Sequence, residues 1–396
     1  MSEFDFKPTA SIFRNRDALT EHWTPDELVG RDEELREYHT ALQPVIENEI
    51  PSNVFLYGKS GVGKTAATRF LLERLQRDAA NVSGLDLHTI EINCDGLNSS
   101  YQTAVQLVNQ LRPARNQISD TGHPQAAVYR FLFEELDDLG GTVLIVLDEV
   151  DHINDDSLLY KLPRARSNGD VENVKLGVIG ISNDLTFREQ LSSKVRSSLC
   201  EKEVSFSAYD AQELQQVLHQ RVDVAFEDAV LDEGVIELCA AFGAKDSGDA
   251  RQALDLLLEA GDIARAENAD TVTETHVDQA REKLQTDQVE EGISNFPEHG
   301  QYVLYALTLL HEDEQTPAKT KEVREIYKVV CEREGVDPIS TRSVREHLAE
   351  LSQLGIISST IENRGVEGGK YKKHSLDQPV KSIRAGLTTL PDDSDR

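Results

Sequence analysis

Apolar residues recur along the chain with two periods, and these periods predict its elements. In residues 1–208, short apolar runs alternate with stretches of helical spacing. The runs are typical of strands buried on both faces, and they lie at residues 53–57, 87–93, 142–147, 175–181 and 204–206. Helical spacing is found at residues 66–75, 101–111 and 125–139. Strands that alternate with helices predict an α/β unit with a parallel sheet. Residues 1–20 are expected to be an irregular lead-in.

The rest of the chain predicts two further units. Residues 209–290 have helical spacing only, with helices expected at residues 211–226, 231–242, 249–268 and 274–284. Residues 285–296 have little pattern and predict a linker. Residues 291–396 predict, in order, helices at 302–310, 321–333 and 340–354, a strand at 356–361 and a hairpin tip at 364–373. This order is typical of a winged helix, whose third helix enters the major groove of DNA.

Composition indicates a globular protein in an unusual charge state. The 396 residues include 39% hydrophobic and 28% charged residues, and the net charge is −30. An acidic excess of this size repels itself unless salt screens it, so we expect a halophilic protein, with an acidic mesophilic protein as the alternative. The charge is uneven, because residues 297–396 hold 14 Lys and Arg against 17 Asp and Glu. The nearly neutral C-terminal part predicts contact with something anionic.

Cysteine spacing and the lack of a long apolar run indicate the compartment. The four cysteines, at positions 94, 200, 239 and 331, are too far apart for a C-x-x-C metal site and are expected to be buried thiols. The start of the chain lacks a signal-peptide pattern, and no apolar stretch approaches the roughly 18 residues of a membrane span. We expect a cytoplasmic, nucleoid-associated protein with no membrane partner.

A glycine-rich loop predicts a nucleotide site. The residues that follow the first strand read Gly58, Lys59, Ser60, Gly61, Val62, Gly63, Lys64, Thr65 and Ala66. The first eight form a complete G-x-x-x-x-G-K-[ST] motif between a strand and a helix. In such a loop, backbone N–H groups surround phosphate oxygens, and the helix N-terminus adds partial positive charge. We expect ATP and ADP as ligands, with Lys64 at the β- and γ-phosphates and Thr65 on Mg²⁺.

Polar residues at later strand ends predict the remaining chemistry. Asp148 and Glu149 end the strand at 142–147, where Asp148 would hold Mg²⁺ and Glu149 would orient and deprotonate the attacking water. Asn183, at the end of the next strand, could reach the γ-phosphate, although capping of the following helix is the alternative. Arg251 lies in the first turn of a helix, where a cation opposes the helix dipole. That position makes sense if Arg251 reaches a phosphate, and a solvated surface arginine is the alternative.

The winged-helix region predicts a DNA-binding surface. In its third helix, Thr341, Arg342 and Arg345 are expected to be exposed near the N-terminus. The hairpin tip carries further cations, at Arg364, Lys370, Lys372 and Lys373. A basic hairpin in an acidic chain favours contact with the DNA backbone or minor groove. A winged helix used only for protein contacts is the alternative.

These motifs together resemble the archaeal DNA replication initiators related to the origin recognition complex and to Cdc-type loader proteins. The resemblance includes Leu28–Asp32, the phosphate loop, Leu147–Asp151, Ser157–Leu162, Ser182–Asp184, Ser247–Leu254 and the winged helix. It implies an AAA+ ATPase base at residues 1–208, a helical lid at 209–290 and a winged helix at 291–396. It also implies sensor roles for Asn183 and Arg251, adenine contacts at Val29, Gly30 and Arg31, and an initiator-specific insertion within residues 95–125.

The resemblance implies a function as well. Members of the family bind double-stranded origin DNA and help to recruit and load the replicative helicase, and ATP-dependent self-assembly on DNA is expected. One position departs from the family pattern, because Lys194 stands where the inter-subunit arginine finger is usual. Either Arg196 serves instead or hydrolysis is weak, so we expect a slow ATPase that works as a switch. A winged-helix transcriptional or signalling regulator switched by ATP is the alternative function.

Overall fold

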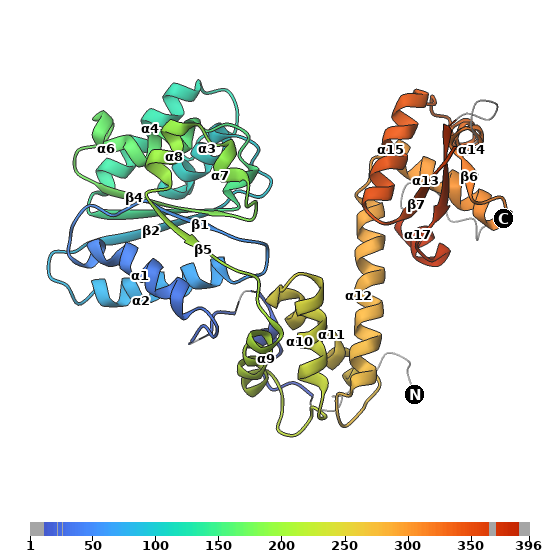
Figure 1. Ribbon diagram of the computed structural model, residues 1–396. Coiled ribbons are helices and arrows are strands. Elements are labelled where there is room, and N and C mark those ends of the chain that lie inside the picture. Colours follow the sequence, from blue (N-terminus) through green and yellow to red (C-terminus); the bar gives the residue numbers. More distant parts are fainter. Residues whose placement is uncertain (1–11, 22, 26, 364–369, 388–396) are drawn as a thin grey trace. The chain divides into compact units, whose positions relative to one another are not determined.

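The structure is a computed structural model of the chain, and it describes residues 12–21, 23–25, 27–363 and 370–387. It divides into two compact units, residues 1–277 and 278–396, and each unit is described by itself (Figure 1). Within the described ranges, no helix is both long enough and apolar enough to cross a membrane.

A five-stranded parallel sheet forms the centre of the first unit. Its strands are β1 (Val54–Tyr57), β2 (Leu87–Asn93), β3 (Thr142–Asp148), β4 (Lys175–Ser182) and β5 (Lys202–Ser205). They lie in the order β2-β3-β4-β1-β5, and every neighbouring pair is parallel. The carboxyl ends of all five strands therefore lie at one edge, where the loops after β1, β3 and β4 meet. The predicted α/β sheet is confirmed.

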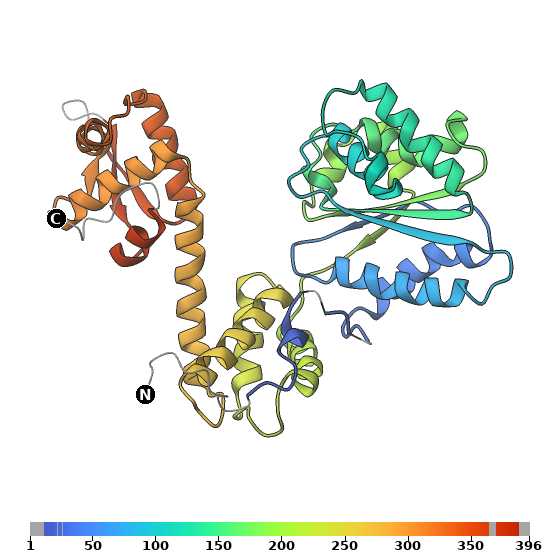
Figure 2. The same cartoon turned by 180° about the vertical axis from the view of Figure 1, so that it is seen from behind.

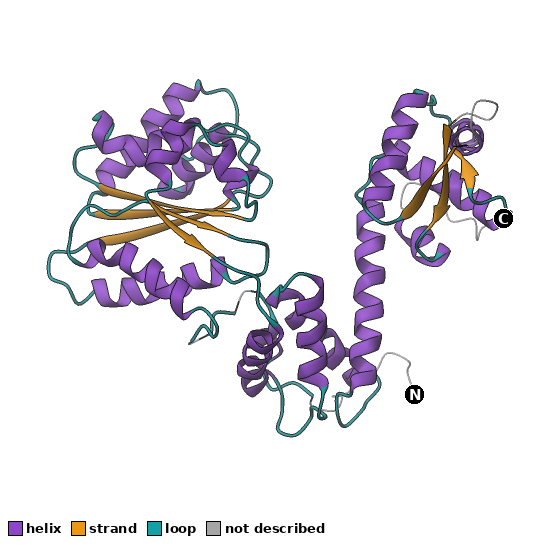
Figure 3. Cartoon of the chain, in the orientation of Figure 1, coloured by secondary structure: helices purple, strands orange, loops and turns teal. Residues whose placement is uncertain are grey.

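Helices cover both faces of this sheet (Figures 1 and 3). One face carries α1 (Asp32–Ile46) and α2 (Lys64–Ala79), and the other carries α3 (Ser100–Leu111), α4 (Gln125–Leu139), α5 (Ser157–Lys161), α6 (Ala165–Asn168), α7 (Phe187–Gln190) and α8 (Ser193–Leu199). Successive strand residues point to opposite faces. In β3, for example, Leu144 and Val146 enter one apolar core, whereas Val143, Ile145 and Leu147 enter the other.

The first unit also contains α9 (Ala211–Ala225), α10 (Val235–Asp246) and α11 (Ala250–Ala266). The N-terminal segment packs against them, although the sequence predicts an irregular lead-in there. It contains a 3-10 helix, η1 (Arg16–Leu19). The Phe13 ring lies 4.9 Å from the Phe226 ring, and Arg16 pairs with Asp262 at 2.7 Å. These contacts attach the segment to α9 and α11.

The second unit is the predicted winged helix. It contains α13 (Glu298–Glu312), α14 (Thr320–Glu334), α15 (Thr341–Gln353) and a sheet of β6 (Ala318–Lys319), β8 (Lys370–Leu376) and β7 (Ile357–Asn363), followed by α17 (Val380–Gly386). The three strands are antiparallel in the order β6-β8-β7, and Figure 2 shows this unit from behind. The linker predicted at residues 285–296 is wrong, because α12 (Glu274–Ser294) continues through most of it.

Candidate nucleotide site and DNA-binding unit

The loop after β1 folds around the side chain of Lys64. Gly61 and Gly63 have φ values of +68° and +92°, which are conformations that glycine adopts readily. Lys64 is only 4% exposed, and its Nζ donates to the carbonyl oxygens of Gly58 and Lys59 at 2.9 and 2.6 Å. Burial lowers the pKa of Lys64 to about 8, although the nearby Asp148 carboxylate opposes this shift. The ammonium group is thus held at the N-terminus of α2, beside the loop.

The ends of β3 and β4 place three polar side chains beside this loop. Thr65 Oγ1 donates to Asp148 Oδ2 at 2.7 Å, so the two predicted metal ligands touch. Asn183 Nδ2 donates to Glu149 Oε1 at 3.4 Å. The structure therefore brings together four residues that the sequence placed in one site.

Glu149 has a left-handed backbone conformation and a carboxyl group with a raised pKa. Its φ is +55°, which is uncommon for a residue with a side chain and is frequent at functional sites. Burial, and then the Asp148 charge, raise the pKa of the Glu149 carboxyl. A carboxylate with a raised pKa accepts a proton more readily, as a general base must.

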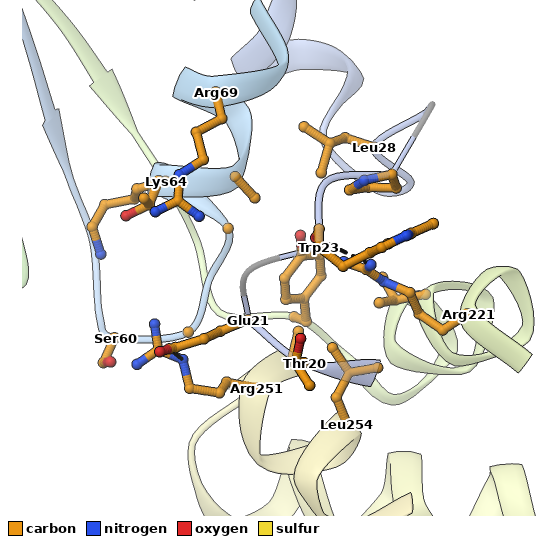
Figure 4. A pocket seen from close by; sticks show the side chains of 18 of the residues that line it. Thr20, Glu21, Trp23, Leu28, Ser60, Lys64, Arg69, Arg221, Arg251 and Leu254 are labelled. Carbon is orange, nitrogen blue, oxygen red and sulfur yellow. Dashed lines mark hydrogen bonds and ion pairs between the residues drawn. The ribbon is translucent and has the colours of Figure 1, made fainter. Parts of the chain in front are cut away.

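Helix α11 brings Arg251 to the same loop. The Asp249 side chain caps α11 and accepts from the Arg251 backbone N–H at 2.7 Å. The preceding N–H, of Ala250, donates to the Gly61 carbonyl at 3.0 Å. A direct backbone contact thus joins the helical part of this unit to the phosphate loop. Figure 4 shows the Arg251 side chain near Ser60 of that loop.

A cavity of about 410 Å³ lies among these elements. It is lined by the predicted residues Val29, Ser60, Gly61, Gly63, Lys64, Thr65, Ala66, Asp148, Glu149, Asn183 and Arg251. Gly58, Lys59, Val62, Gly30 and Arg31 are not in its lining, although the sequence predicts nucleotide contacts for all five.

The buried side chain of Arg31 contacts the phosphate loop on the side away from the cavity lining. Its side chain is 1% exposed, and it donates to the carbonyls of Val62 at 3.0 Å and Ser207 at 2.7 Å. Its guanidinium group also lies 3.6 Å from the centre of the Tyr209 ring. Arg31 therefore connects α1, the phosphate loop and the segment that leads into α9, and its side chain does not line the cavity.

The two candidate finger residues lie in α8, away from this cavity. Lys194 is exposed and Arg196 is half-buried, and neither lines the cavity of its own chain.

In the second unit, α15 and the hairpin carry the predicted DNA contacts. Arg342 is 89% exposed and pairs with Glu346 at 2.8 Å, whereas Arg345 is exposed and Thr341 half-buried. In β8, Lys372 is exposed and Lys373 pairs with Glu362 at 3.0 Å. Lys370 begins β8, and Arg364 lies outside the described residues. Among the described residues, the predicted cations therefore lie on one helix, α15, and one strand, β8.

Comparisons with known proteins identify the family. The chain matches an AAA ATPase domain over residues 27–171, a Cdc6 AAA+ ATPase-type lid domain over 215–282 and the C-terminal winged helix domain of CDC6 over 291–385. It is 54% identical over 388 residues to the ORC1-type DNA replication protein 11 of Haloarcula marismortui, covering 98% of this chain and 94% of the relative. The chain belongs to the family of ORC1-type DNA replication proteins.

Other members of the ORC1-type family agree with this assignment. The ORC1-type DNA replication protein 10 of Halobacterium salinarum is 47% identical over 380 residues, which are 95% of this chain and 92% of the relative. A solved structure of the Aeropyrum pernix ORC1 protein in complex with DNA is 36% identical, with a TM-score of 0.84 and coverage of 96% of this chain and 97% of that chain. The predicted resemblance and the AAA+ and winged-helix architecture are confirmed, and the relatives include haloarchaeal proteins.

Sequence reasoning missed the N-terminal contribution to the site. Glu21 and Trp23 line the cavity, yet both belong to a stretch without a motif. The Trp23 ring lies 4.2 Å from the guanidinium carbon of Arg221, a cavity residue that is only 7% exposed. A lone tryptophan in a polar segment is the one signal that could have drawn attention to this stretch.

Proposed function

We propose that this ORC1-type protein is a replication initiator that binds double-stranded origin DNA under the control of bound ATP or ADP. One observation carries the proposal. Lys64, the Thr65–Asp148 pair, the Glu149–Asn183 pair and Arg251 line one cavity, in a chain that also contains a winged helix. The AAA+ base at residues 1–208, the lid at 209–290 and the winged helix at 291–396 are the functional division that we propose.

The phosphates of ATP would lie at the phosphate loop. Lys64 supplies a cation, and the N-terminus of α2 supplies backbone donors. The hydroxyl of Thr65 and the carboxylate of Asp148 are oxygen ligands of the kind that Mg²⁺ prefers, and they lie 2.7 Å apart. They fit the ion, which would neutralise charge on the phosphates.

Hydrolysis would be slow, so that the bound nucleotide acts as a switch. Glu149 would take a proton from the attacking water, and Asn183 would orient it. The cation that stabilises developing charge would come from a neighbouring subunit, through Lys194 or Arg196. A lysine at that position lacks the planar fork with which arginine holds a phosphate at two points.

DNA binding would use α15 in the major groove and the β7–β8 hairpin on the backbone or in the minor groove. The Aeropyrum pernix ORC1 protein was solved in complex with DNA, which supports DNA binding. Recruitment of the replicative helicase and ATP-dependent self-assembly on DNA are further parts of the proposal. They rest on the family resemblance.

The test uses the full-length protein and two variants. Lys64→Ala is expected to lose binding of both ATP and ADP, measured by isothermal titration calorimetry. Glu149→Gln is expected to retain ATP but to lose at least about 100-fold in hydrolysis, which is the usual contribution of general-base catalysis. Unchanged nucleotide binding in Lys64→Ala would contradict the site, and unchanged hydrolysis in Glu149→Gln would contradict the role of Glu149.

A further inference from the structure

The N-terminal segment brings a carboxylate into the nucleotide cavity. The backbone N–H groups of Arg14 and Asn15 donate to the Ala225 carbonyl at 2.8 and 3.0 Å, which holds the segment on the end of α9. Further along, Glu21 lines the cavity together with Ser60 and Gly61 of the phosphate loop. A negative charge beside a phosphate site is unfavourable unless it has a partner or a task.

Glu21 forms an ion pair with Arg251. The Arg251 Nε lies 3.2 Å from Glu21 Oε2, and both side chains are 50% exposed. Figure 4 shows the two side chains directed toward each other beside Ser60. The backbone of Arg251 is fixed by the Asp249 cap and by the Ala250–Gly61 contact. The side chain can therefore exchange partners while its helix stays in place.

We propose that Glu21 is a specificity-determining residue that competes with the terminal phosphate of a nucleoside triphosphate for Arg251. The proposal rests on the proposed function, in which Arg251 contacts that phosphate. A diphosphate leaves the Glu21–Arg251 pair intact. A triphosphate weakens it, because the γ-phosphate is attracted to the same guanidinium group and repels the Glu21 carboxylate beside it.

Glu21 therefore lowers the affinity for ATP and leaves the affinity for ADP nearly unchanged. A ligand shifts an equilibrium only by its differential affinity for the two states, which here are the paired and the unpaired Arg251. The Glu21–Arg251 pair therefore sets the ATP concentration at which the γ-phosphate replaces Glu21 at Arg251. When ATP binds, Glu21 is released from Arg251, and Glu21 belongs to a segment that is attached to α9 and α11.

The experiment compares ATP and ADP affinities of wild type, Glu21→Gln, Arg251→Ala and the double variant, by calorimetry and by the fluorescence of Trp23. Glu21→Gln is expected to raise the ratio of ATP to ADP affinity about two- to fivefold, the range for an exposed ion pair. In the Arg251→Ala background the same change is expected to leave the ratio as it is. Asp17→Asn removes a charge from the same segment outside the cavity and is expected to change nothing.

Two results would overturn the proposal. One is an equal gain for ATP and ADP in Glu21→Gln, and the other is a gain that persists without Arg251, because either result makes Glu21 a simple repelling charge. The proposed function fails in a different way. In that case the wild type binds neither nucleotide, or Lys64→Ala binds both as well as the wild type does.

Discussion

At the scale of single residues, Lys64 makes nucleotide binding depend on pH. Burial lowers its pKa to about 8, and only the protonated ammonium attracts phosphate. ADP affinity is therefore expected to fall about tenfold between pH 7 and pH 9, because bound phosphate favours the protonated form and each pH unit above the pKa costs up to tenfold. Calorimetric titration at pH 7, 8 and 9 measures this fall.

Lys64→Arg provides the control for this pH dependence, since a guanidinium group stays protonated throughout the range. It is expected to bind more weakly at pH 7 and to lose less affinity as the pH rises. Equal losses in Lys64→Arg and wild type would show that another group titrates.

The positions of Lys64, Thr65 and Asp148 beside one cavity were predictable from local patterns. A strand, a turn and a helix fix Lys64 and Thr65, and the end of a buried parallel strand fixes Asp148. Arg31 was not, because its role depends on Ser207 and Tyr209, which the chain reaches only after the whole sheet. The contact between Glu21 and Arg251 joins two segments with no shared pattern, so no spacing in the sequence could indicate it.

At the scale of elements, the docking of α11 on the phosphate loop requires a glycine. A Cβ atom at Gly61 would lie 1.5 Å from Asp249 Oδ1, so Gly61→Ala must displace the cap of α11. We expect it to lower ATP affinity at least about tenfold, a loss of roughly 1.4 kcal/mol. Calorimetry measures the affinity, and far-UV circular dichroism checks that the fold is retained.

Gly84→Ala is the matched control for Gly61→Ala. Gly84 also has a positive φ, of +83°, but a Cβ atom there meets nothing within 4 Å. This variant is expected to lose about 1–2 kcal/mol of stability from backbone strain and no nucleotide affinity. If both variants lost affinity equally, backbone strain alone would explain the effect.

Helix α15, for which we propose contact with the major groove, contains two arginines in different electrostatic settings. Arg342 is paired with Glu346 at 2.8 Å, whereas no ion pair of Arg345 is found within the described part of the chain. Arg345→Ala is therefore expected to weaken binding to a DNA duplex more than Arg342→Ala does, since Arg342 has to leave Glu346 before it reaches DNA. Fluorescence anisotropy measures both affinities.

Glu346→Gln completes this comparison, because it frees Arg342 and removes a charge that repels phosphate. It is expected to strengthen binding. Stronger loss in Arg342→Ala than in Arg345→Ala, or no gain in Glu346→Gln, would contradict the arrangement of α15 on DNA.

Elements with an apolar stripe were predictable, and one element without such a stripe was not. The segment 285–296 is mostly polar and has few apolar positions, so its pattern favours a linker. It is nevertheless helical to Ser294, and Ile293 is fully buried in the apolar core of the second unit. Good helix formers such as Gln and Glu extend α12 from a helix that has already begun.

At the scale of the whole molecule, the net charge of −30 destabilises the compact state by self-repulsion. The midpoint of thermal unfolding is therefore expected to rise with potassium chloride between about 0.1 and 1 M, where the screening length falls from about 10 to 3 Å. Differential scanning calorimetry measures this midpoint. A midpoint that did not change with salt would mean that the acidic surface does not strain the fold.

The central claim joins the nucleotide site to DNA at replication origins. The measurement that tests it most directly is genome-wide mapping of DNA bound by the protein in its own cells, with Lys64→Ala expressed at the same level. We predict discrete peaks at replication start sites for the wild type, and weaker or altered occupancy at those sites for Lys64→Ala. Binding spread over promoters, or peaks at start sites that Lys64→Ala leaves unchanged, would contradict an initiator that is switched by ATP.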